Sequence, residues 1–270
     1  MQSIIRWAGS KRQLLHKLRR LWPIGAKRYV EPFCGSACLF FNLEPSYAIL
    51  GDRNSELIST YRALKLDASL VCECLRRLRK GETAYYKIRS VTLDTLSEAE
   101  IAARFLYLNR YCFNGIYRTN RGGEFNVPYG PQRRDTGFNF AMIGAAAQIL
   151  KRASLVNDDF EETLKLVEHG DFVYLDPPYA VARRRVFTEY HPETFTIRDL
   201  ERLRRCLEEL ERKEVMFVVS YADCKEARDL FAPWSHQRVR IRRHIAGFAA
   251  HRRHAYELLA TNVEALSHAD

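Results

Sequence analysis

Short apolar runs that end in polar or glycine-containing turns characterise the beginning of the chain. Tyr29-Val30 lead into a turn around Gly35, residues 38–41 resemble the first turn of a helix, and residues 47–50 form a second apolar run that ends near Asp52. The order strand, turn, helix, strand is the first unit of a doubly wound α/β sheet. We therefore predict an α/β fold whose sheet begins near residue 29.

The middle of the chain follows a different pattern. Apolar residues recur there at helical spacing, for example at Leu57, Ile58, Tyr61 and Leu64. In residues 117–129, two stretches with a strand-like alternation of residue types flank Gly122-Gly123, and this pattern predicts a β-hairpin. Because Arg, Asn and Tyr are frequent in this hairpin, it has the composition of a contact surface.

The last part of the chain returns to α/β character. Residues 171–175 are typical of a buried strand, residues 199–212 have helical spacing, and residues 215–220 and 255–260 are further strand patterns. The simplest architecture is one parallel-type sheet interrupted by an inserted recognition module. The expected division is into residues 1–54, 55–145 and 146–270.

The composition is that of a folded, basic protein. Of the 270 residues 47% are hydrophobic, and 43 Lys and Arg stand against 33 Asp and Glu, which gives a net charge of +10. Such a chain can bury a sizeable core, and its positive balance suits a polyanionic partner, of which nucleic acid is the commonest. A basic protein without such a partner is the alternative that charge alone leaves open.

Cysteine spacing and the lengths of apolar runs argue against several other classes. The seven cysteines include no CxxC pair, and the HxxH of His251 and His254 is more typical of solvated or phosphate-facing side chains than of a metal site. No apolar run reaches the roughly 18 residues of a membrane span. We expect a reduced, cytoplasmic protein with neither a metal nor a membrane partner; the oligomeric state is left open, and a monomer would suffice.

The turn at residues 33–37 has the chemistry of a ligand-binding loop. Gly35 lets backbone come close to a ligand, and the helix that follows offers free N–H groups. The residues do not form GxGxxG, so a dinucleotide site is poorly supported. Asp52 ends the next strand, where such folds hold ribose hydroxyls, although alone it fits a helix cap or a turn better.

The most specific motif is Asp176-Pro177-Pro178-Tyr179, directly after a buried strand. The two prolines fix φ and remove two N–H donors, so the loop is stiff. Adenine N6 is a poor nucleophile because its lone pair is delocalised into the ring. Asp176 and a proline carbonyl could accept both N6 hydrogens while Tyr179 stacks on the base, so that positioning and electrostatics favour methyl transfer.

Five blocks of the sequence resemble, in order, the Dam-like family of DNA adenine-N6 methyltransferases. They cover nearly the whole chain and comprise residues 6–11 (RWAGSK), 30–37 (VEPFCGSA), 108–118 with 123–130, 176–179 (DPPY) and 252–262. The resemblance implies a Rossmann-like class I methyltransferase sheet with an inserted helical and β-hairpin DNA-recognition domain. It also implies S-adenosylmethionine as methyl donor and double-stranded DNA as substrate.

The resemblance assigns most of a cofactor site to the first two blocks and to Asp52 after them. Trp7 and Lys11 would contact the methionine end of the cofactor, with Lys11 near its carboxylate. Phe33 and Gly35 would shape the loop, and Asp52 would hold the ribose.

The remaining site residues lie in the last part of the chain. Asp159 and Phe160 match the position that recognises the cofactor adenine, Asp159 at its amino group and Phe160 against its ring. Asp176 would act on both the cofactor and the target adenine, which Pro177 and Tyr179 would help to hold.

An adenine in a duplex must be flipped out to reach a buried methyl donor. Phe113 or Tyr111, beside Asn114, could fill the gap that the base leaves, although Phe113 fits a hairpin core equally well.

Base reading is expected at the start of the hairpin. Arg118 has the side chain that most often reads guanine, and the resemblance places Arg6 near the first guanine of the target. Pro128 and Ile116 could contact a thymine methyl or could pack the hairpin. Together these residues favour a GATC-like palindrome.

Phosphate contacts are expected from basic residues beyond the catalytic loop. The candidates are Arg183, Arg184 and Arg185, with Arg240, Arg242, Arg243, Arg252 and Arg253 downstream. A solvated basic face is the alternative for each of them.

The sequence departs from the family pattern at three places. Ala37 stands where a second glycine is usual, and Tyr221 follows Ser220 where an Asn is more usual. Pro131-Gln132 replace residues that are often Arg and an aromatic in members reading GATC. The alternatives are methyl transfer to cytosine N4, RNA or a protein glutamine, and a non-catalytic DNA-binding relative. Cytosine-N4 enzymes often have Ser, and glutamine enzymes usually have Asn, in place of Asp176.

Overall fold

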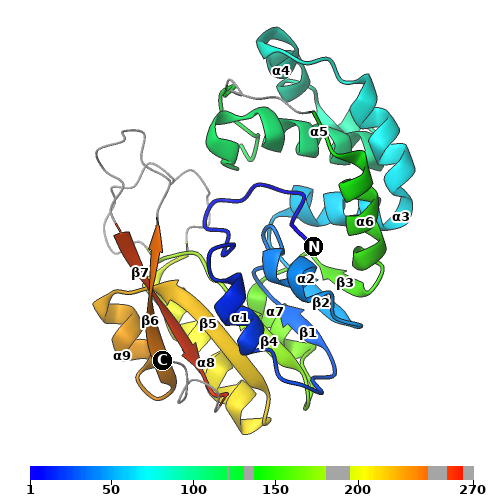
Figure 1. Ribbon diagram of the computed structural model, residues 1–270. Coiled ribbons are helices and arrows are strands. Elements are labelled where there is room, and N and C mark those ends of the chain that lie inside the picture. Colours follow the sequence, from blue (N-terminus) through cyan, green and yellow to red (C-terminus); the bar gives the residue numbers. More distant parts are fainter. Residues whose placement is uncertain (121, 131–136, 181–194, 243–253, 264–270) are drawn as a thin grey trace.

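A computed structural model describes residues 1–120, 122–130, 137–180, 195–242 and 254–263. Within them one sheet has the strand order β3-β2-β1-β4-β5-β7-β6 (Figure 1). The strands are β1 (Tyr29–Glu31), β2 (Ala48–Gly51), β3 (Ala153–Val156), β4 (Phe172–Leu175), β5 (Met216–Ala222), β6 (Ser235–Arg242) and β7 (His254–Thr261). The predicted Rossmann-like α/β class is confirmed.

The two carboxyl-terminal strands do not follow the parallel arrangement. β1 to β5 pair in parallel, whereas β7 is antiparallel to both β5 and β6. The expectation of a parallel sheet is therefore wrong for the last pair. β6 was not expected, because its arginines suggested a contact surface, although buried Val239 alternates with exposed Arg238 and Arg240.

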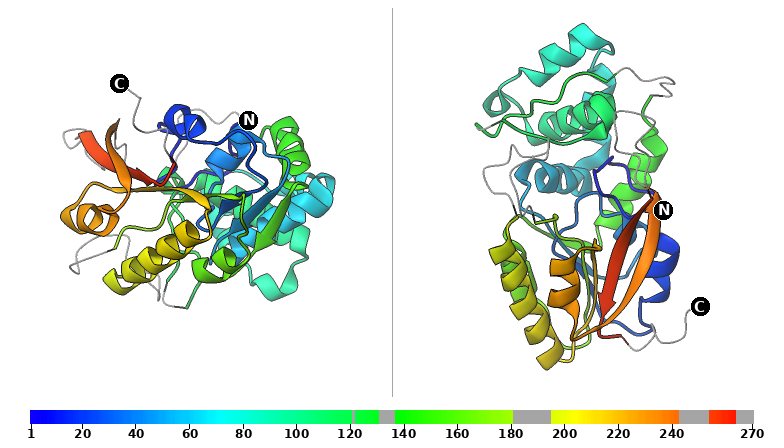
Figure 2. Two further views of the ribbon diagram at one scale, coloured as in Figure 1. Left: turned by 90° about the horizontal axis from the view of Figure 1, so that it is seen from below. Right: turned by 90° about the vertical axis from the view of Figure 1, so that its left-hand side faces the viewer.

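Helices cover both faces of the sheet. They are α1 (Leu15–Arg20), α2 (Cys38–Leu43), α3 (Ser55–Arg77), α4 (Glu82–Arg89), α5 (Glu98–Tyr111), α6 (Phe140–Leu150), α7 (Phe160–Lys165), α8 (Ile197–Arg212) and α9 (Lys225–Phe231). Because neighbouring strand residues face opposite sides, Tyr29 and Phe172 pack with α1, α2 and α3, while Val30 and Val173 pack with α7, α8 and α9 (Figure 2).

The segment between β2 and β3 forms a helical lobe, with α4 and α5 at the top of Figure 1. α3 contacts β3 and packs on α5, with Glu56 of its first turn paired to Arg104 of α5, and its helical geometry breaks at Asp67 (φ −149°, ψ 86°). Ser97 and Glu100 form a capping box that fixes the start of α5. The division of the chain at residues 54 and 145 stays a prediction.

The predicted hairpin at residues 117–129 pairs only locally. Its described residues form the antiparallel bridge Thr119–Phe125, and Cys112–Tyr129 forms a second bridge at its base. The backbone N–H of Asn126 donates to the carbonyl of Arg118 at 3.1 Å. The turn is therefore present, but the extended strands expected on either side are not. No helix among the described residues is long and apolar enough to cross a membrane.

Candidate active site

The candidate site residues lie where strands end. The loop after β1, Asp52 after β2, Asp159 after β3 and Asp176 after β4 all follow the carboxyl ends of parallel strands. Because these ends meet at one edge of the sheet, the residues come together although they are far apart in sequence.

The Asp52 carboxylate joins the first two of these strand ends. Its Oδ2 accepts a hydrogen bond from the backbone N–H of Gly35 at 2.9 Å, and its Oδ1 accepts one from Asn54 at 2.9 Å. Both carboxylate oxygens of Asp52 are thus used to join the loop to the end of β2. Asp52 therefore shapes the loop, and its expected contact with ribose hydroxyls stays a prediction.

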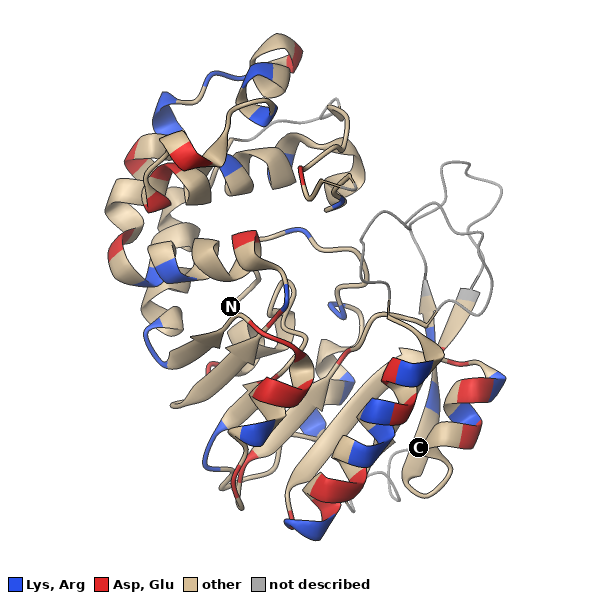
Figure 3. Cartoon of the chain, turned by 180° about the vertical axis from the view of Figure 1, so that it is seen from behind, with Lys and Arg blue, Asp and Glu red and all other residues tan. Residues whose placement is uncertain are grey.

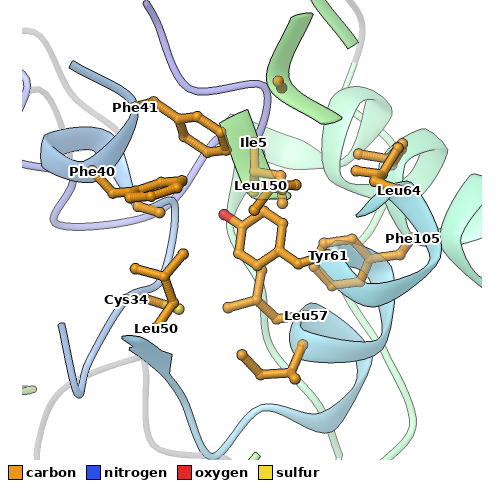
Figure 4. Packing of buried hydrophobic residues seen from close by; sticks show 14 of the residues in the cluster. Ile5, Cys34, Phe40, Phe41, Leu50, Leu57, Tyr61, Leu64, Phe105 and Leu150 are labelled. Atoms are coloured by element: carbon orange, nitrogen blue, oxygen red, sulfur yellow. The ribbon is translucent and has the colours of Figure 1, made fainter. Parts of the chain in front are cut away.

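Gly35 is required by a close approach of Trp7. Its φ is +45°, and a Cβ atom at this position would lie 2.7 Å from Cδ1 of the Trp7 ring. The Tyr61 hydroxyl also donates a hydrogen bond to the Gly35 carbonyl at 2.8 Å. Figure 4 shows the Tyr61 ring reaching from α3 past Leu57 toward Cys34 and Phe40. The loop is thus held by contacts with both Trp7 and Tyr61.

Ala37 has the left-handed backbone that favours glycine. Its φ is +48° and its ψ is 39°, and its side chain is fully buried at the N-cap of α2. This conformation costs a non-glycine residue about 1–2 kcal/mol. This backbone conformation explains why the family usually has a second glycine here. In this chain Ala37 adopts the same conformation at that cost in free energy.

Two aromatic rings and one acid lie at the other end of the loop. The rings of Phe33 and Phe160 stack with centroids 5.1 Å apart. Asp159 caps α7 by accepting from the backbone N–H of Glu161, and its Oδ1 also accepts from Arg202 at 2.7 Å. Asp159 and the buried Phe160 are thus held by partners within the chain, and their contact with a cofactor adenine stays a prediction.

The motif after β4 surrounds a buried lysine. Lys11 Nζ lies 2.9 Å from Asp176 Oδ1 and 3.2 Å from Glu257 Oε1, and it donates to the Tyr179 hydroxyl at 3.3 Å. The Lys11 and Glu257 side chains are only 4% and 3% exposed. Lys11 was expected near a cofactor carboxylate; the structure places it directly against the catalytic motif.

Burial and charge shift the pKa values in this cluster. Desolvation raises the pKa of Asp176 to about 6, although Lys11 opposes the shift. Burial alone would lower the pKa of Lys11, but its three partners outweigh it and raise that pKa. Desolvation also raises the pKa of Tyr179 to about 12. At neutral pH the cluster therefore holds a cationic Lys11 and an ionised Asp176.

A second line of hydrogen bonds supports Asp176 from the sheet. The Ser220 hydroxyl donates to Asp176 Oδ1 at 3.1 Å and lies 2.9 Å from the Tyr174 hydroxyl. Pro177 is buried and Pro178 is exposed. The Tyr179 ring packs edge-on against Tyr221, with centroids 5.1 Å apart. Contacts with β5 therefore hold the loop both at the Asp176 carboxylate and at the Tyr179 ring.

The base-flipping candidates separate by exposure. Phe113 is 47% exposed, so the hairpin-core interpretation of this ring is wrong, whereas Tyr111 is 2% exposed and belongs to the core. Asn114 is exposed and adopts a positive φ of 55°. Gly130 fixes this turn, because a Cβ there would lie 2.6 Å from the Phe113 Cα.

The other DNA-reading candidates surround this turn. Arg6 Nη1 donates to the Arg110 carbonyl at 3.2 Å, and its backbone pairs with the Asn109 side chain. Arg118 Nε donates to Asn126 Oδ1 at 2.8 Å, which orients its guanidinium. Pro128 is exposed. Both arginines are thus positioned by the lobe, and which bases they contact stays a prediction.

Some expected residues fall outside the described chain. Arg183, Arg184 and Arg185 do so, as do Pro131, Gln132, Arg243, His251, Arg252 and Arg253. On α8, acidic and basic side chains alternate (Figure 3) and pair at positions three or four apart, as Arg204 does with Glu208. That helix therefore contributes no one-sided basic surface. The described residues contain no group of acids, histidines and cysteines that could hold a metal ion.

Sequence reasoning missed three residues that shape the site. Glu257 was noted only as part of a matching block, Tyr61 as one of several apolar helix positions, and Tyr117 as part of the hairpin. The Tyr117 ring stacks on Trp7 with centroids 5.5 Å apart, so it joins the lobe to the loop. The signal available in the sequence for Glu257 was a lone acid within an apolar strand.

Comparisons with known proteins agree with this geometry. A family model described as D12 class N6 adenine-specific DNA methyltransferase matches residues 7–245. The chain is 33% identical over 271 residues to the Type II methyltransferase M1.LlaDCHI of Lactococcus lactis subsp. cremoris, covering 97% of this chain and 95% of that protein. It is 32% identical over 264 residues to the DNA adenine methylase of Escherichia coli (strain K12), covering 96% and 94%. The Retron Ec67 DNA adenine methylase of Escherichia coli is 32% identical over 268 residues, covering 97% and 92%.

Proposed function

The chain belongs to the D12 class of N6 adenine-specific DNA methyltransferases, and from this premise we propose that it moves a methyl group from S-adenosylmethionine to an adenine flipped out of double-stranded DNA. The observation that carries the proposal is the Asp176 carboxylate, held between Lys11 and Ser220 beside two prolines. A monomer acting in the cytoplasm would suffice for this reaction.

The catalytic role of this chain's residues is to hold the amino group and to handle its proton. Asp176 and the Pro177 carbonyl accept the two N6 hydrogens, which draws the nitrogen toward tetrahedral geometry and frees its lone pair. Tyr179 stacks on the base. The pKa of about 6 keeps Asp176 ionised at neutral pH, so that it can take the proton that N6 must lose.

The residues around Gly35 fit a nucleoside methyl donor. Asp52 places a carboxylate beside the loop, where it would accept from ribose hydroxyls; Phe33 and Phe160 form an aromatic wall, and Trp7 lies against Gly35. When bound, S-adenosylmethionine supplies an electrophilic methyl group on a sulfonium. Asp176 begins the catalytic motif and Lys11 pairs with it, and both would contact the methionine end.

The lobe supplies a reading surface for the duplex. Exposed Phe113 and Asn114 would fill the space left by the flipped base. Arg118 and Arg6 would each read a guanine, and Pro128 would contact a thymine methyl. Arg183, Arg184 and Arg185 would contact phosphates. These roles favour a GATC-like site.

The test is methylation of a duplex library with randomised positions, using S-adenosylmethionine that carries a labelled methyl group. The products are sequenced for N6-methyladenine and digested to identify the methylated base. We expect label on adenine N6 within a site that contains guanine. Label on cytosine, label only with RNA, or a site lacking guanine would contradict the corresponding part of the proposal.

A further inference from the structure

Glu257 reaches the catalytic motif from the last strand of the sheet. It lies on β7, and its Oε1 atom accepts a hydrogen bond from the Tyr179 hydroxyl at 3.1 Å. The same atom is 3.2 Å from Lys11 Nζ, which also contacts Asp176. One carboxylate oxygen thus contacts two residues of the site that the proposed function uses.

A structural role alone explains this carboxylate poorly. Glu257 is 3% exposed, and none of the described residues donates a hydrogen bond to its Oε2 atom. Burying a charge costs free energy, and apolar residues commonly replace a buried ion pair without loss of stability. A buried, half-satisfied acid therefore calls for a functional explanation.

We propose that Glu257 is a positioning residue for methyl transfer, which orients Tyr179 and divides the Lys11 ammonium between two carboxylates. The inference rests on the proposed function, because it assigns Glu257 to the same reaction.

The division of the ammonium affects Asp176 directly. With Glu257 present, Lys11 directs one N–H toward each acid and another to Tyr179. Without that second acid, Lys11 pairs with Asp176 alone and competes with the adenine amino group for the same oxygen. Tyr179 at the same time loses the hydrogen bond that its hydroxyl donates to Glu257, so its ring is less fixed for stacking. Both effects slow the chemical step and leave the phosphate contacts unchanged.

Two variants separate the charge of Glu257 from its hydrogen bond. Glu257→Gln keeps an oxygen acceptor and removes the charge, whereas Glu257→Leu removes both. The matched control is Asp171→Asn, which removes another buried acid that pairs with an arginine, Arg28, at the opposite end of β4. Each protein is checked by thermal unfolding before single-turnover methylation and DNA binding are measured.

The pH profile gives a readout that a packing defect would not change. Asp176 is surrounded by titratable or polar groups from several elements, namely Lys11, Glu31, Tyr174, Tyr179, Ser220 and Glu257. The negative charge of Glu257 raises the pKa of Asp176. Removing that charge should therefore move the acidic limb of kcat/KM to lower pH.

We expect Glu257→Leu to slow single-turnover methylation by about 10- to 100-fold, as loss of positioning does. The single-turnover rate of Glu257→Gln should lie between those of Glu257→Leu and wild type, and the acidic limb of its kcat/KM profile should move to lower pH. DNA affinity should stay within about twofold, and Asp171→Asn should keep both rate and limb. A folded Glu257→Leu with the wild-type rate, or a Glu257→Gln with an unshifted limb, overturns the inference. Wild-type protein that methylates no adenine would instead refute the proposed function.

Discussion

Replacement of Lys11 by methionine tests the ion-pair cluster at the centre of the site. Methionine has about the length of lysine and no charge, so Lys11→Met preserves packing while it removes the cation. Asp176 and Glu257 then remain as neighbouring carboxylates, with side chains that are only 20% and 3% exposed. Within the described ranges, the donors that remain to them are the neutral hydroxyls of Ser220 and Tyr179.

The cost follows from leaving buried charge uncompensated. Removing one partner of a buried ion pair destabilises a protein by about 3–5 kcal/mol, several times the effect of an exposed pair. Lys165→Met is the matched control, because Lys165 pairs with Glu162 on the surface. Its free energy of unfolding should change by no more than about 0.5 kcal/mol.

The loss in Lys11→Met should depend on pH. Lys11 lowers the pKa of Asp176, so the variant raises that pKa above the wild-type value of about 6. An acid whose folded pKa is raised is favoured while protonated, and stability falls as pH rises from its unfolded toward its folded pKa. Between about pH 6 and pH 8, Asp176 is already ionised in the folded wild type. In the folded variant Asp176 is still protonated over part of this range, so the variant continues to lose stability as the pH rises.

Urea denaturation at about pH 5.5 and pH 8 measures this difference. Lys11→Met should lose more stability, relative to wild type, at the higher pH. The double variant Lys11→Met/Glu257→Gln should be more stable than Lys11→Met, because it removes one of the two uncompensated acids. The reasoning would be refuted if Lys11→Met lowered the free energy of unfolding by less than about 1 kcal/mol at both pH values. It would also be refuted if the effects of Lys11→Met and Glu257→Gln on that free energy simply added in the double variant.

Three further predictions concern the loop and the lobe. Asp52→Ala should weaken S-adenosylmethionine binding by about 1.5–3 kcal/mol per lost charge-assisted hydrogen bond, and unchanged calorimetric affinity would remove Asp52 from the site. Gly130→Ala should destabilise the protein by about 1–3 kcal/mol, because the new Cβ meets backbone at Phe113; an unaltered unfolding midpoint would show that the turn can relax. Arg118→Ala should lose about 1–3 kcal/mol of discrimination at one guanine, and an unchanged methylation logo would exclude that role.

The sequence was informative wherever a site residue follows a local pattern. The glycine turn, Asp52 and the motif from Asp176 all stand directly after apolar runs, so periodicity alone located them at strand ends. Glu257 could not be placed in this way. It meets Lys11 only because β7 inserts antiparallel between β5 and β6, and nothing local to residue 257 specifies that neighbour.

The same limit applies to contacts made by the lobe. Tyr61 has the spacing of a helix core residue, and it is one, but its hydroxyl also anchors the Gly35 carbonyl. The hairpin pattern predicted the turn and overestimated the strands, because alternation cannot show how many backbone pairs will form. Exposure, which separates Phe113 from Tyr111, required the packed structure.

Single-turnover methylation by Asp176→Ala tests the central claim most directly. Enzyme in excess over a duplex that contains one target adenine is mixed with labelled S-adenosylmethionine, and DNA affinity is measured in parallel. Phosphate contacts dominate DNA affinity, so binding should change little while methyl transfer to adenine N6 is abolished. Substantial residual transfer by the folded variant would contradict the assignment of Asp176 as the residue that holds the target amino group.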